Sequence, residues 1–306
     1  MHLSMHRRAT RPVGSLPSTP MVQTDPAAVR RALRGIRALV LDADGVIFLC
    51  GEAIPGSLEA VARLEDRGVP YRVVTNFSSL HRATLAARLG GTHARRFDPE
   101  RIITASSAAA AYTAAHHAGQ SIVVVSAPDA LREFDGQRVV PIADAQPGEV
   151  AAVVVGDAGD ELSYRNMDAL FRVIRGGAAF LAMHRNPWWL TPKGPTIDAG
   201  AIVAGLEYAT GRRATVLGKP SPEVFRQALA GLRADLGDRL PAHDVAMVGD
   251  DPDADVRAAQ RVGMRGILVL TGKTTSERLA GGRLGAGRRA PDGVAASLAE
   301  VVAALD

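Results

Sequence analysis

Carboxylate, hydroxyl and lysine side chains stand in four short groups along the chain, each after a run of apolar residues that indicates a strand. The groups are LDADGV (41–46), TNFSS (75–79), GKPSPEVF (218–225) and VGDDPDADV (248–256). These are the residue types that phosphoryl transfer beside a divalent cation requires. Because open parallel sheets bind ligands at the carboxyl ends of their strands, we expect the four groups to meet at one sheet edge.

Asp42 and Asp44 form the candidate catalytic pair. In a segment that leaves a strand, residues two apart project to the same side, so both carboxyl groups can face one small volume. One carboxylate can attack phosphorus, while the other protonates the leaving oxygen and later activates water. The alternative is a pair of turn-forming or helix-capping acids. The position after an apolar strand favours the catalytic interpretation.

A magnesium ion is the cofactor that the acidic residues predict. A phosphate ester beside two carboxylates would be repelled unless a cation intervened, and Mg²⁺ binds oxygen ligands of this kind. Asp250, at the end of an apolar run that starts at residue 245, is the remaining carboxylate that we expect to bind the metal. The Asp42 carboxylate and the Asp44 backbone carbonyl would complete the protein ligands.

Two further acids in the same group allow two interpretations each. Asp251 contacts a metal-bound water or simply starts a helix. Asp255 complements the dipole of that helix or holds the ammonium group of Lys219 in position. The spacing of these acids also imitates a calcium-binding EF-hand loop, but Val256 stands where that loop requires glycine, which excludes it.

Thr75, Asn76 and Lys219 are the candidate phosphate-binding residues. A hydroxyl and newly exposed backbone N–H groups at a strand end can bind phosphate oxygens without adding negative charge. Lys219 precedes Ser221 and Pro222, which are typical of a helix N-cap and its first turn and would fix the position of the lysine. A cation held there can offset charge on the transferring phosphoryl group. The alternatives are a cap for the following helix and a solvated surface lysine.

Size, charge and apolar content exclude several protein classes. The chain has 306 residues, 47% of them hydrophobic, and is long enough for two domains. Residues 1–37 contain seven arginines and one acid, so the basic excess lies in a tail and argues against a nucleic-acid partner. No apolar run is long enough to span a membrane, and residues 1–24 lack the apolar segment of a secretory signal, so we expect a cytoplasmic protein without a membrane partner; an organelle transit peptide is the alternative for this segment. Residues 272–274 resemble the end of a P-loop, but Ile267 replaces the required glycine, which argues against an NTPase.

The elements that must position these residues alternate along the chain. Strands are expected at 38–42, 70–75, 101–104, 121–126, 150–157, 178–184, 245–250 and 266–271. Helices are expected at 57–67, 80–89, 106–118, 163–175, 254–262 and 291–304. This alternation is typical of an α/β protein with a Rossmann-like parallel sheet.

The predicted domain division follows from a gap between the motifs. The phosphate-type motifs resume only near residue 216, and the block before them has its own strands and helices, which indicates an inserted domain. We predict a flexible N-terminal extension at 1–24, a core domain at 25–105 and 215–306, and an inserted domain at 106–214.

The motifs DADGV, TNFSS, GKPSPEVF and GDDPDADV, in this order, resemble those of the haloacid dehalogenase (HAD) superfamily of phosphatases. The insert resembles the α/β C2-type cap of subfamily IIA, which contains NagD-like and 4-nitrophenylphosphatase-like enzymes. Residues 181–211 are most similar to the branch of phospholysine phosphohistidine inorganic pyrophosphate phosphatases and related hydrolase-domain proteins. The likeness covers about residues 36–275. Phe77 departs from the pattern, since many relatives have asparagine there.

The resemblance implies a role for each motif. It makes Asp42 the nucleophile, Asp44 the acid and base, Thr75 and Lys219 the phosphate-binding pair, and Asp250 a metal ligand. It also implies a homodimer formed through the cap. The expected function is Mg²⁺-dependent hydrolysis of a small phosphorylated metabolite through an aspartyl-phosphate on Asp42. The alternatives are a phosphotransferase and a catalytically weak binding or regulatory protein with the same fold.

Substrate choice is expected to depend on the inserted domain, because a phosphate site alone barely touches the leaving group. The specificity candidates are His184, Arg185 and Trp188, with Asn186 and Trp189 beside them. The two adjacent tryptophans are expected in a proline-containing loop. There they would form a lid, an apolar anchor within the inserted domain, or a dimer contact.

Overall fold

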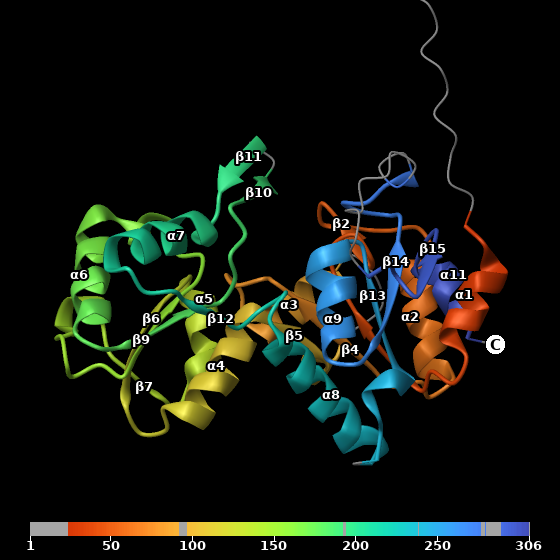
Figure 1. Cartoon of the computed structure of the whole chain (residues 1–306), viewed down its shortest axis with the longest axis horizontal. Coiled ribbons are helices and arrows are strands. Elements are labelled where there is room, and N and C mark those ends of the chain that lie inside the picture. The colour runs from red at the N-terminus through yellow and green to blue at the C-terminus, as the bar shows by residue number, and fades with distance from the viewer. Residues whose placement is uncertain are drawn as a thin grey trace, which may run out of the picture.

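The structure is a computed structural model of the whole chain. It describes residues 24–91, 97–191, 194–237, 239–276, 279 and 289–305. The predicted N-terminal extension lies outside the described residues apart from residue 24. Figure 1 shows two lobes side by side, each built around a sheet. The first lobe contains the six-stranded sheet and the second lobe contains the five-stranded sheet.

The sheet of the first lobe is entirely parallel, with the strand order β15-β14-β13-β1-β4-β5. Its strands are β1 (Ala38–Leu41), β4 (Tyr71–Thr75), β5 (Ile102–Thr104), β13 (Val245–Gly249), β14 (Arg265–Val269) and β15 (Gly293–Ala295). The chain runs outward from β1 through β4 to β5, and later outward from β13 on the other side of β1. The strand order therefore reverses between β1 and β13, which is where open α/β sheets leave a crevice for ligands.

Helices cover both faces of this sheet because its central strands are buried throughout. Leu39 and Leu41 pack in one apolar cluster, whereas Ala38 and Val40 pack in another on the opposite face, as the two-residue period of a strand requires. The helices on the first face are α1 (Pro26–Leu33), α2 (Ser57–Asp66), α3 (Arg82–Gly91) and α11 (Leu298–Ala303). Those on the second face are α4 (Ala105–His116), α8 (Pro222–Leu236) and α9 (Ala258–Arg261). The predicted α/β class with a parallel sheet is confirmed.

The sheet of the second lobe is also parallel, with the strand order β12-β9-β8-β6-β7. Its strands are β6 (Ser121–Val125), β7 (Arg138–Val139), β8 (Ala152–Val155), β9 (Ala179–Ala182) and β12 (Thr215–Val216). The helices of this lobe are α5 (Pro128–Leu131), α6 (Tyr164–Arg175) and α7 (Ala199–Thr210). Since β12 pairs with β9, the second sheet extends through residue 216.

Helix α4 packs against both sheets. Ala108 belongs to an apolar cluster of the first lobe, while Ala105, Ala109 and Ala110 belong to a cluster that also contains strands of the second lobe. Alanine methyl groups on two sides of the helix let both layers approach closely, and Tyr112 packs, partly buried, against the cluster that contains strands of the second lobe. The helix therefore connects the two lobes through packing as well as through the chain.

Two antiparallel hairpins complete the strands. They are β2 (Phe48–Leu49) with β3 (Glu52–Ala53), and β10 (Trp188–Thr191) with β11 (Gly194–Ile197). Trp188 and Trp189, which we expected in a loop, are strand residues of β10. Figure 1 shows the β10–β11 hairpin projecting away from the body of the second lobe. The sequence did not indicate this hairpin because its strands are short and partly exposed and lack the apolar run of a buried strand.

Short helical turns connect the longer elements, and two predicted helices near the C-terminal end differ from the structure. The turns are η1 (Pro99–Arg101), η2 (Arg132–Phe134), η3 (Ile142–Asp144), η4 (Gly159–Leu162), η5 (Ala242–Asp244) and the π-helix η6 (Pro252–Arg257). The helix predicted at 254–262 instead starts as η6 and continues as α9. The helix predicted at 291–304 was partly wrong, because three residues near its start form the edge strand β15 against β14.

Candidate active site

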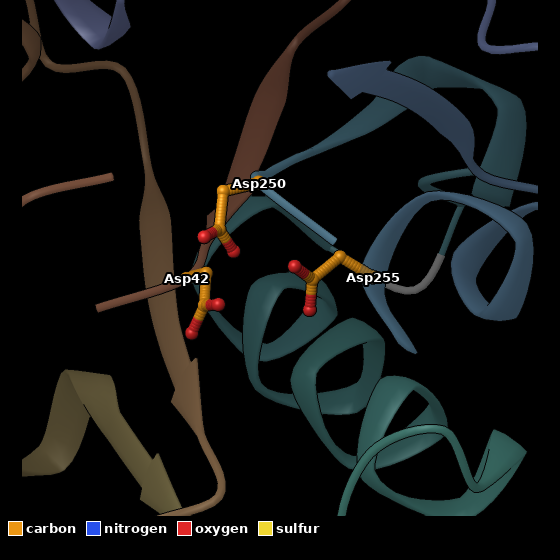
Figure 2. Close-up of side chains that lie close together, drawn as sticks. All are labelled: Asp42, Asp250 and Asp255. Atoms are coloured by element: carbon orange, nitrogen blue, oxygen red, sulfur yellow. The ribbon is translucent and has the colours of Figure 1, made fainter. Parts of the chain in front are cut away.

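Three aspartate side chains converge at the carboxyl edge of the six-stranded sheet. Asp42 follows β1, Asp250 follows β13, and Asp255 lies in η6. Each offers a carboxylate oxygen, and these atoms all lie within 4.8 Å of one another. Figure 2 shows the three side chains gathered around one small volume. Their exposed fractions are only 6%, 3% and 0%, so the three charges share a site with little water.

Lys219 neutralises part of this charge. Its Nζ lies 2.5 Å from Asp42 Oδ1 and 2.9 Å from Asp255 Oδ1, and its side chain is buried. Burial alone would lower the pKa of Lys219, but the charges of Asp255 and Asp42 outweigh it and raise the pKa above its ordinary value. Lys219 is therefore a permanent cation between two carboxylates. Of the two interpretations of Asp255, the contact with Lys219 is present.

The backbone around Lys219 is held by Asn76 and by the start of α8. The Asn76 side-chain amide donates to the Lys219 carbonyl at 3.0 Å, and its Oδ1 accepts from the Lys219 N–H at 2.8 Å. A Cβ on Gly218 would lie 2.7 Å from Asn76 Oδ1, so this close approach requires glycine. Ser221 caps α8 and Pro222 opens it, as predicted. The side chain of Asn76, a predicted phosphate-binding residue, is thus engaged with the main chain of Lys219.

Thr75 ends β4, the strand beside β1, and is buried at the same sheet edge. Its Oγ1 accepts a hydrogen bond from the Phe77 N–H at 3.3 Å, which shapes the turn after the strand. Phe77, the departure from the family pattern, packs against the apolar cluster of the first face. The Phe77 ring therefore contributes to the apolar packing of the first lobe.

Asp44 lies in the turn after Asp42 and is exposed. Desolvation by the surrounding chain raises the pKa of its carboxyl, while the cations Lys219 and Lys273 act in the opposite direction. Gly45 follows with a φ of 77°, and a Cβ there would collide with the Asp250 carboxylate. The turn can therefore fold back over Asp250 only with glycine at this position.

The segment after β14 is a part of the site that the sequence did not reveal. The Lys273 backbone N–H donates to Asp250 Oδ2 at 2.6 Å, and a Cβ on Gly272 would collide with the same carboxylate. The Lys273 ammonium lies 3.2 Å from Asp251 Oδ2. The available signal was a glycine and a lysine just beyond an apolar run, a pattern that also resembles the end of a P-loop.

Asp251 starts η6. Its Oδ1 accepts from the backbone N–H groups of Asp253 and Ala254, both at 2.9 Å. These are the bonds of a helix-starting acid, one of the two interpretations of this residue. The Asp255 carboxylate accepts from the Asp251 N–H at 3.1 Å, so the two acids brace the turn between them.

The charge of this cluster fits a divalent cation. Burial and the Asp255 charge raise the pKa of Asp42 well above its ordinary range, although Lys219 opposes them, and burial with the Asp255 charge raises the pKa of Asp250 to about 6. One ammonium faces three carboxylates, which leaves an excess of negative charge. Asp255 Oδ1 accepts no well-aligned hydrogen bond despite its contact with Lys219. Hard oxygen donors that crowd one another in this way are the ligands that Mg²⁺ binds.

The three specificity candidates lie in different surroundings. His184 is buried between the lobes, with its Nε2 at 2.9 Å from Ser78 Oγ and 3.7 Å from Asp198 Oδ1. Burial lowers the pKa of His184 despite the nearby acids, which favours the neutral ring. Arg185 pairs with Glu207 at 2.7 Å, whereas Trp188 has 59% of its surface exposed on the hairpin.

Comparison with known proteins gives consistent matches. A family model described as haloacid dehalogenase-like hydrolase matches residues 39–139, and one described as HAD-hydrolase-like matches residues 216–301. The chain is 35% identical over 251 residues to the phospholysine phosphohistidine inorganic pyrophosphate phosphatase of Homo sapiens. That match covers 79% of this chain and 86% of the relative.

Two solved structures extend the comparison to the fold. A p-nitrophenyl phosphatase from Archaeoglobus fulgidus is 30% identical with a TM-score of 0.78, and the match covers 88% of this chain and 99% of that one. A glycerol phosphate phosphatase from Mycobacterium tuberculosis in complex with magnesium is 25% identical with a TM-score of 0.73. That match covers 88% of this chain and 77% of the other.

Proposed function

The chain belongs to the haloacid dehalogenase-like hydrolases, and from that premise we propose that it is a Mg²⁺-dependent phosphatase of small phosphorylated metabolites. The observation that carries the proposal is the convergence of Asp42, Asp250, Asp255 and Lys219 at the point where the strand order reverses. Nothing in the packing of either lobe requires three buried carboxylates and an ammonium in one place. Buried charges of this kind are costly, and they are typical of sites that bind or convert charged ligands.

Asp42 is the proposed nucleophile. A carboxylate oxygen of Asp42 attacks phosphorus, the bond from phosphorus to the leaving oxygen breaks, and Asp44 donates a proton to that oxygen. Asp44, now ionised, then takes a proton from water, whose oxygen attacks the aspartyl-phosphate and releases inorganic phosphate. The raised pKa of Asp44 supports the first of these proton transfers, because its carboxyl keeps its proton to a higher pH than an ordinary aspartic acid does.

Thr75 and Lys219 are the proposed phosphate-binding residues, and Asn76 holds Lys219 in place. The Lys219 ammonium offsets the negative charge of the transferring phosphoryl group. Its contacts with Asp42 and Asp255 fix the position of the ammonium beside the nucleophile. The pairing of Asn76 with the Lys219 main chain supports this division of roles. Asp255 therefore acts on the reaction through Lys219.

A magnesium ion would be held by the carboxylates of Asp42 and Asp250 and by the backbone carbonyl of Asp44. When bound, it supplies positive charge that attracts the phosphate and stabilises the charge that develops on its oxygens. The Lys273 N–H fixes the orientation of the Asp250 carboxylate for this purpose. The crowding of carboxylates and their raised pKa values support the assignment.

The second lobe is the proposed cap. Most of this lobe falls within the inserted domain predicted at 106–214, its sheet also includes β12, and its hairpin carries the exposed Trp188. We propose that the hairpin selects among leaving groups, and that closure of the cap excludes water from the first step. In the part of the chain that the structure describes, no helix is both long and apolar enough to cross a membrane.

The experiment is hydrolysis of 4-nitrophenyl phosphate by the purified protein with Mg²⁺ and with EDTA. We expect turnover only with the metal, and a loss of about a thousandfold or more in kcat for Asp42→Asn. Asp66→Asn, an exposed carboxylate on α2, is the matched control and should leave the rate unchanged. Metal-independent turnover, or an active Asp42→Asn enzyme, would contradict the proposal.

A substrate screen completes this test. The relatives named above act on phospholysine, phosphohistidine, pyrophosphate, p-nitrophenyl phosphate or glycerol phosphate, as their names state. We expect the chain to favour one chemical class among these P–N, P–O–P and P–O–C bonds. Transfer of the phosphoryl group to an added alcohol, in place of its release, would identify a phosphotransferase.

A further inference from the structure

Residues 78–82 connect the proposed phosphate-binding residues to the second lobe. They follow the Thr75–Asn76 turn after one residue, Phe77, and lead into α3. Ser78 contacts three segments of the second lobe, each just beyond the carboxyl end of a strand. The Ser126 Oγ donates to the Ser78 carbonyl at 2.7 Å, and Ser78 Oγ lies 2.9 Å from His184 Nε2 and 3.3 Å from the Asp157 N–H.

Two carboxylates of the second lobe then bind the start of α3. Asp129 Oδ2 accepts from the His81 N–H at 2.8 Å, and Glu133 Oε1 accepts from the Arg82 N–H at 2.6 Å. Glu133 Oε2 accepts from the Arg82 guanidinium through Nε at 2.9 Å and Nη2 at 2.7 Å. The first N–H groups of a helix lack partners within the helix, so these acids satisfy them from the other lobe.

Glu133 is the stronger of the two anchors. Only 1% of its side chain is exposed, compared with 30% for Asp129. Charge-assisted hydrogen bonds to a buried carboxylate are stronger than neutral ones, and here two guanidinium N–H groups of Arg82 converge on Oε2 while its backbone N–H binds Oε1. His81 Nε2 lies 3.8 Å from the same carboxylate. The start of α3 is therefore bound to the second lobe, while its residues Leu85 and Ala86 pack in the apolar cluster of the first lobe.

The segment is fixed at both ends. Thr75 is held in the sheet, and Asn76 is held by the main chain of Lys219, whereas His81 and Arg82 are held by the second lobe. Only four residues, 77–80, separate these two anchors. A shift of the second lobe relative to the first must therefore change the conformation of the turn that carries the phosphate-binding groups.

We propose that Asp129 and Glu133 are positioning residues, through which the position of the second lobe sets the phosphate affinity of the Thr75–Asn76 turn. This inference rests on the proposed function for the identity of the ligand, and it adds a coupling between cap and phosphate site. Coupling of this kind is reciprocal, so phosphate bound at the turn must also stabilise the contact between the lobes.

The test compares Glu133→Gln with the matched control Glu149→Gln, an exposed residue of the same lobe. Glutamine keeps the size and one acceptor but turns an NH₂ group toward Arg82. We expect KM for 4-nitrophenyl phosphate, and the inhibition constant of inorganic phosphate, to rise roughly tenfold, with a smaller change in kcat. Backbone amides of residues 76–84 should exchange hydrogen faster, and Glu149→Gln should match the wild type in every measurement.

A second variant keeps the proposal testable if Glu133→Gln does not fold. Ser126→Ala removes an uncharged donor to the Ser78 carbonyl and should produce the same changes to a smaller extent. In the wild type, inorganic phosphate with Mg²⁺ should slow amide exchange in residues 129–134. Unchanged exchange at 76–84 in both variants, or equal changes in the control, would overturn the coupling. If no phosphatase activity is found, the proposed function fails, while the exchange of 76–84 still tests the contact between the lobes.

Discussion

Replacement of Asp250 by asparagine should stabilise the metal-free protein at neutral pH. Asp250 is buried, and burial together with the Asp255 charge raises its pKa from 3.8 to about 6. Asparagine is close in size, and its side-chain oxygen can still accept the Lys273 N–H that lies 2.6 Å from Asp250 Oδ2. The substitution therefore removes a charge and leaves the packing and this hydrogen bond in place.

The magnitude follows from the pKa. A group whose pKa is raised by folding favours the native state only while it is protonated. Its contribution is fully present below about pH 4 and is lost as the pH rises through about 6. Ionised Asp250 therefore costs the metal-free protein about 3 kcal/mol at neutral pH, on the scale of 1.36 kcal/mol for each pKa unit.

The assay is urea unfolding of both proteins in EDTA between pH 4.5 and 7.5. Asp250→Asn should gain stability relative to the wild type across this window, toward about 3 kcal/mol at pH 7.5. Mg²⁺ at a hundred times its dissociation constant should raise the free energy of unfolding of the wild type by about 2.7 kcal/mol and leave that of the variant unchanged. Asp66→Asn, exposed on α2, should show neither effect. A difference between wild type and Asp250→Asn that stays constant with pH would refute the reasoning.

Three further predictions concern the neighbouring residues. Lys219→Met leaves two carboxylates without their cation, so we expect kcat/KM to fall by at least about a thousandfold and stability by about 3–5 kcal/mol, measured by kinetics and urea unfolding. Gly218→Ala places a Cβ 2.7 Å from Asn76 Oδ1 and should cost about 1–3 kcal/mol of stability; an unchanged unfolding midpoint would argue against this crowding. Trp188→Ala should change the free energy of unfolding by less than about 0.5 kcal/mol, because the residue is 59% exposed. The ratio of kcat/KM between bulky and small phosphate esters should change. If the substrate ranking is identical, the hairpin does not determine specificity.

The site was predictable where buried strands end. A central parallel strand is covered on both faces, so it appears in the sequence as an unbroken apolar run, and the first polar residue after it lies at the sheet edge. Asp42 and Asp250 follow β1 and β13 in this way, and those strands are neighbours. The sheet thus brings together residues that are some two hundred positions apart.

The contacts made by residues on turns and helices were less predictable. Asp255 had two interpretations because its direction depends on η6, a π-helix whose wider turn the sequence pattern did not indicate. The role of Lys273 depends on its backbone N–H, which every residue except proline carries, so no side-chain pattern signals it. The contact of Glu133 with Arg82 joins the two lobes, and sequence spacing holds no information on it.

The two elements that were missed fail for a similar reason. Strand β15 has three residues, too few to show an alternating pattern, and it is specified by its pairing with β14. The β10–β11 hairpin has two partly exposed strands, and its tryptophans indicated a loop because proline stands next to them. Strand β15 depends on β14 more than twenty residues away, whereas the two strands of the hairpin pair with each other but lack the apolar pattern of a buried strand.

The packing of α4 has a consequence for cooperativity. One helix supplies alanine methyl groups to the apolar interior of each lobe, so neither interior can lose the helix without exposing part of the other. The lobes are therefore joined energetically as well as by their crossing chains, and a defect in one interior weakens both. We therefore expect both lobes to unfold in a single transition, and any movement of one lobe against the other to keep α4 packed against both.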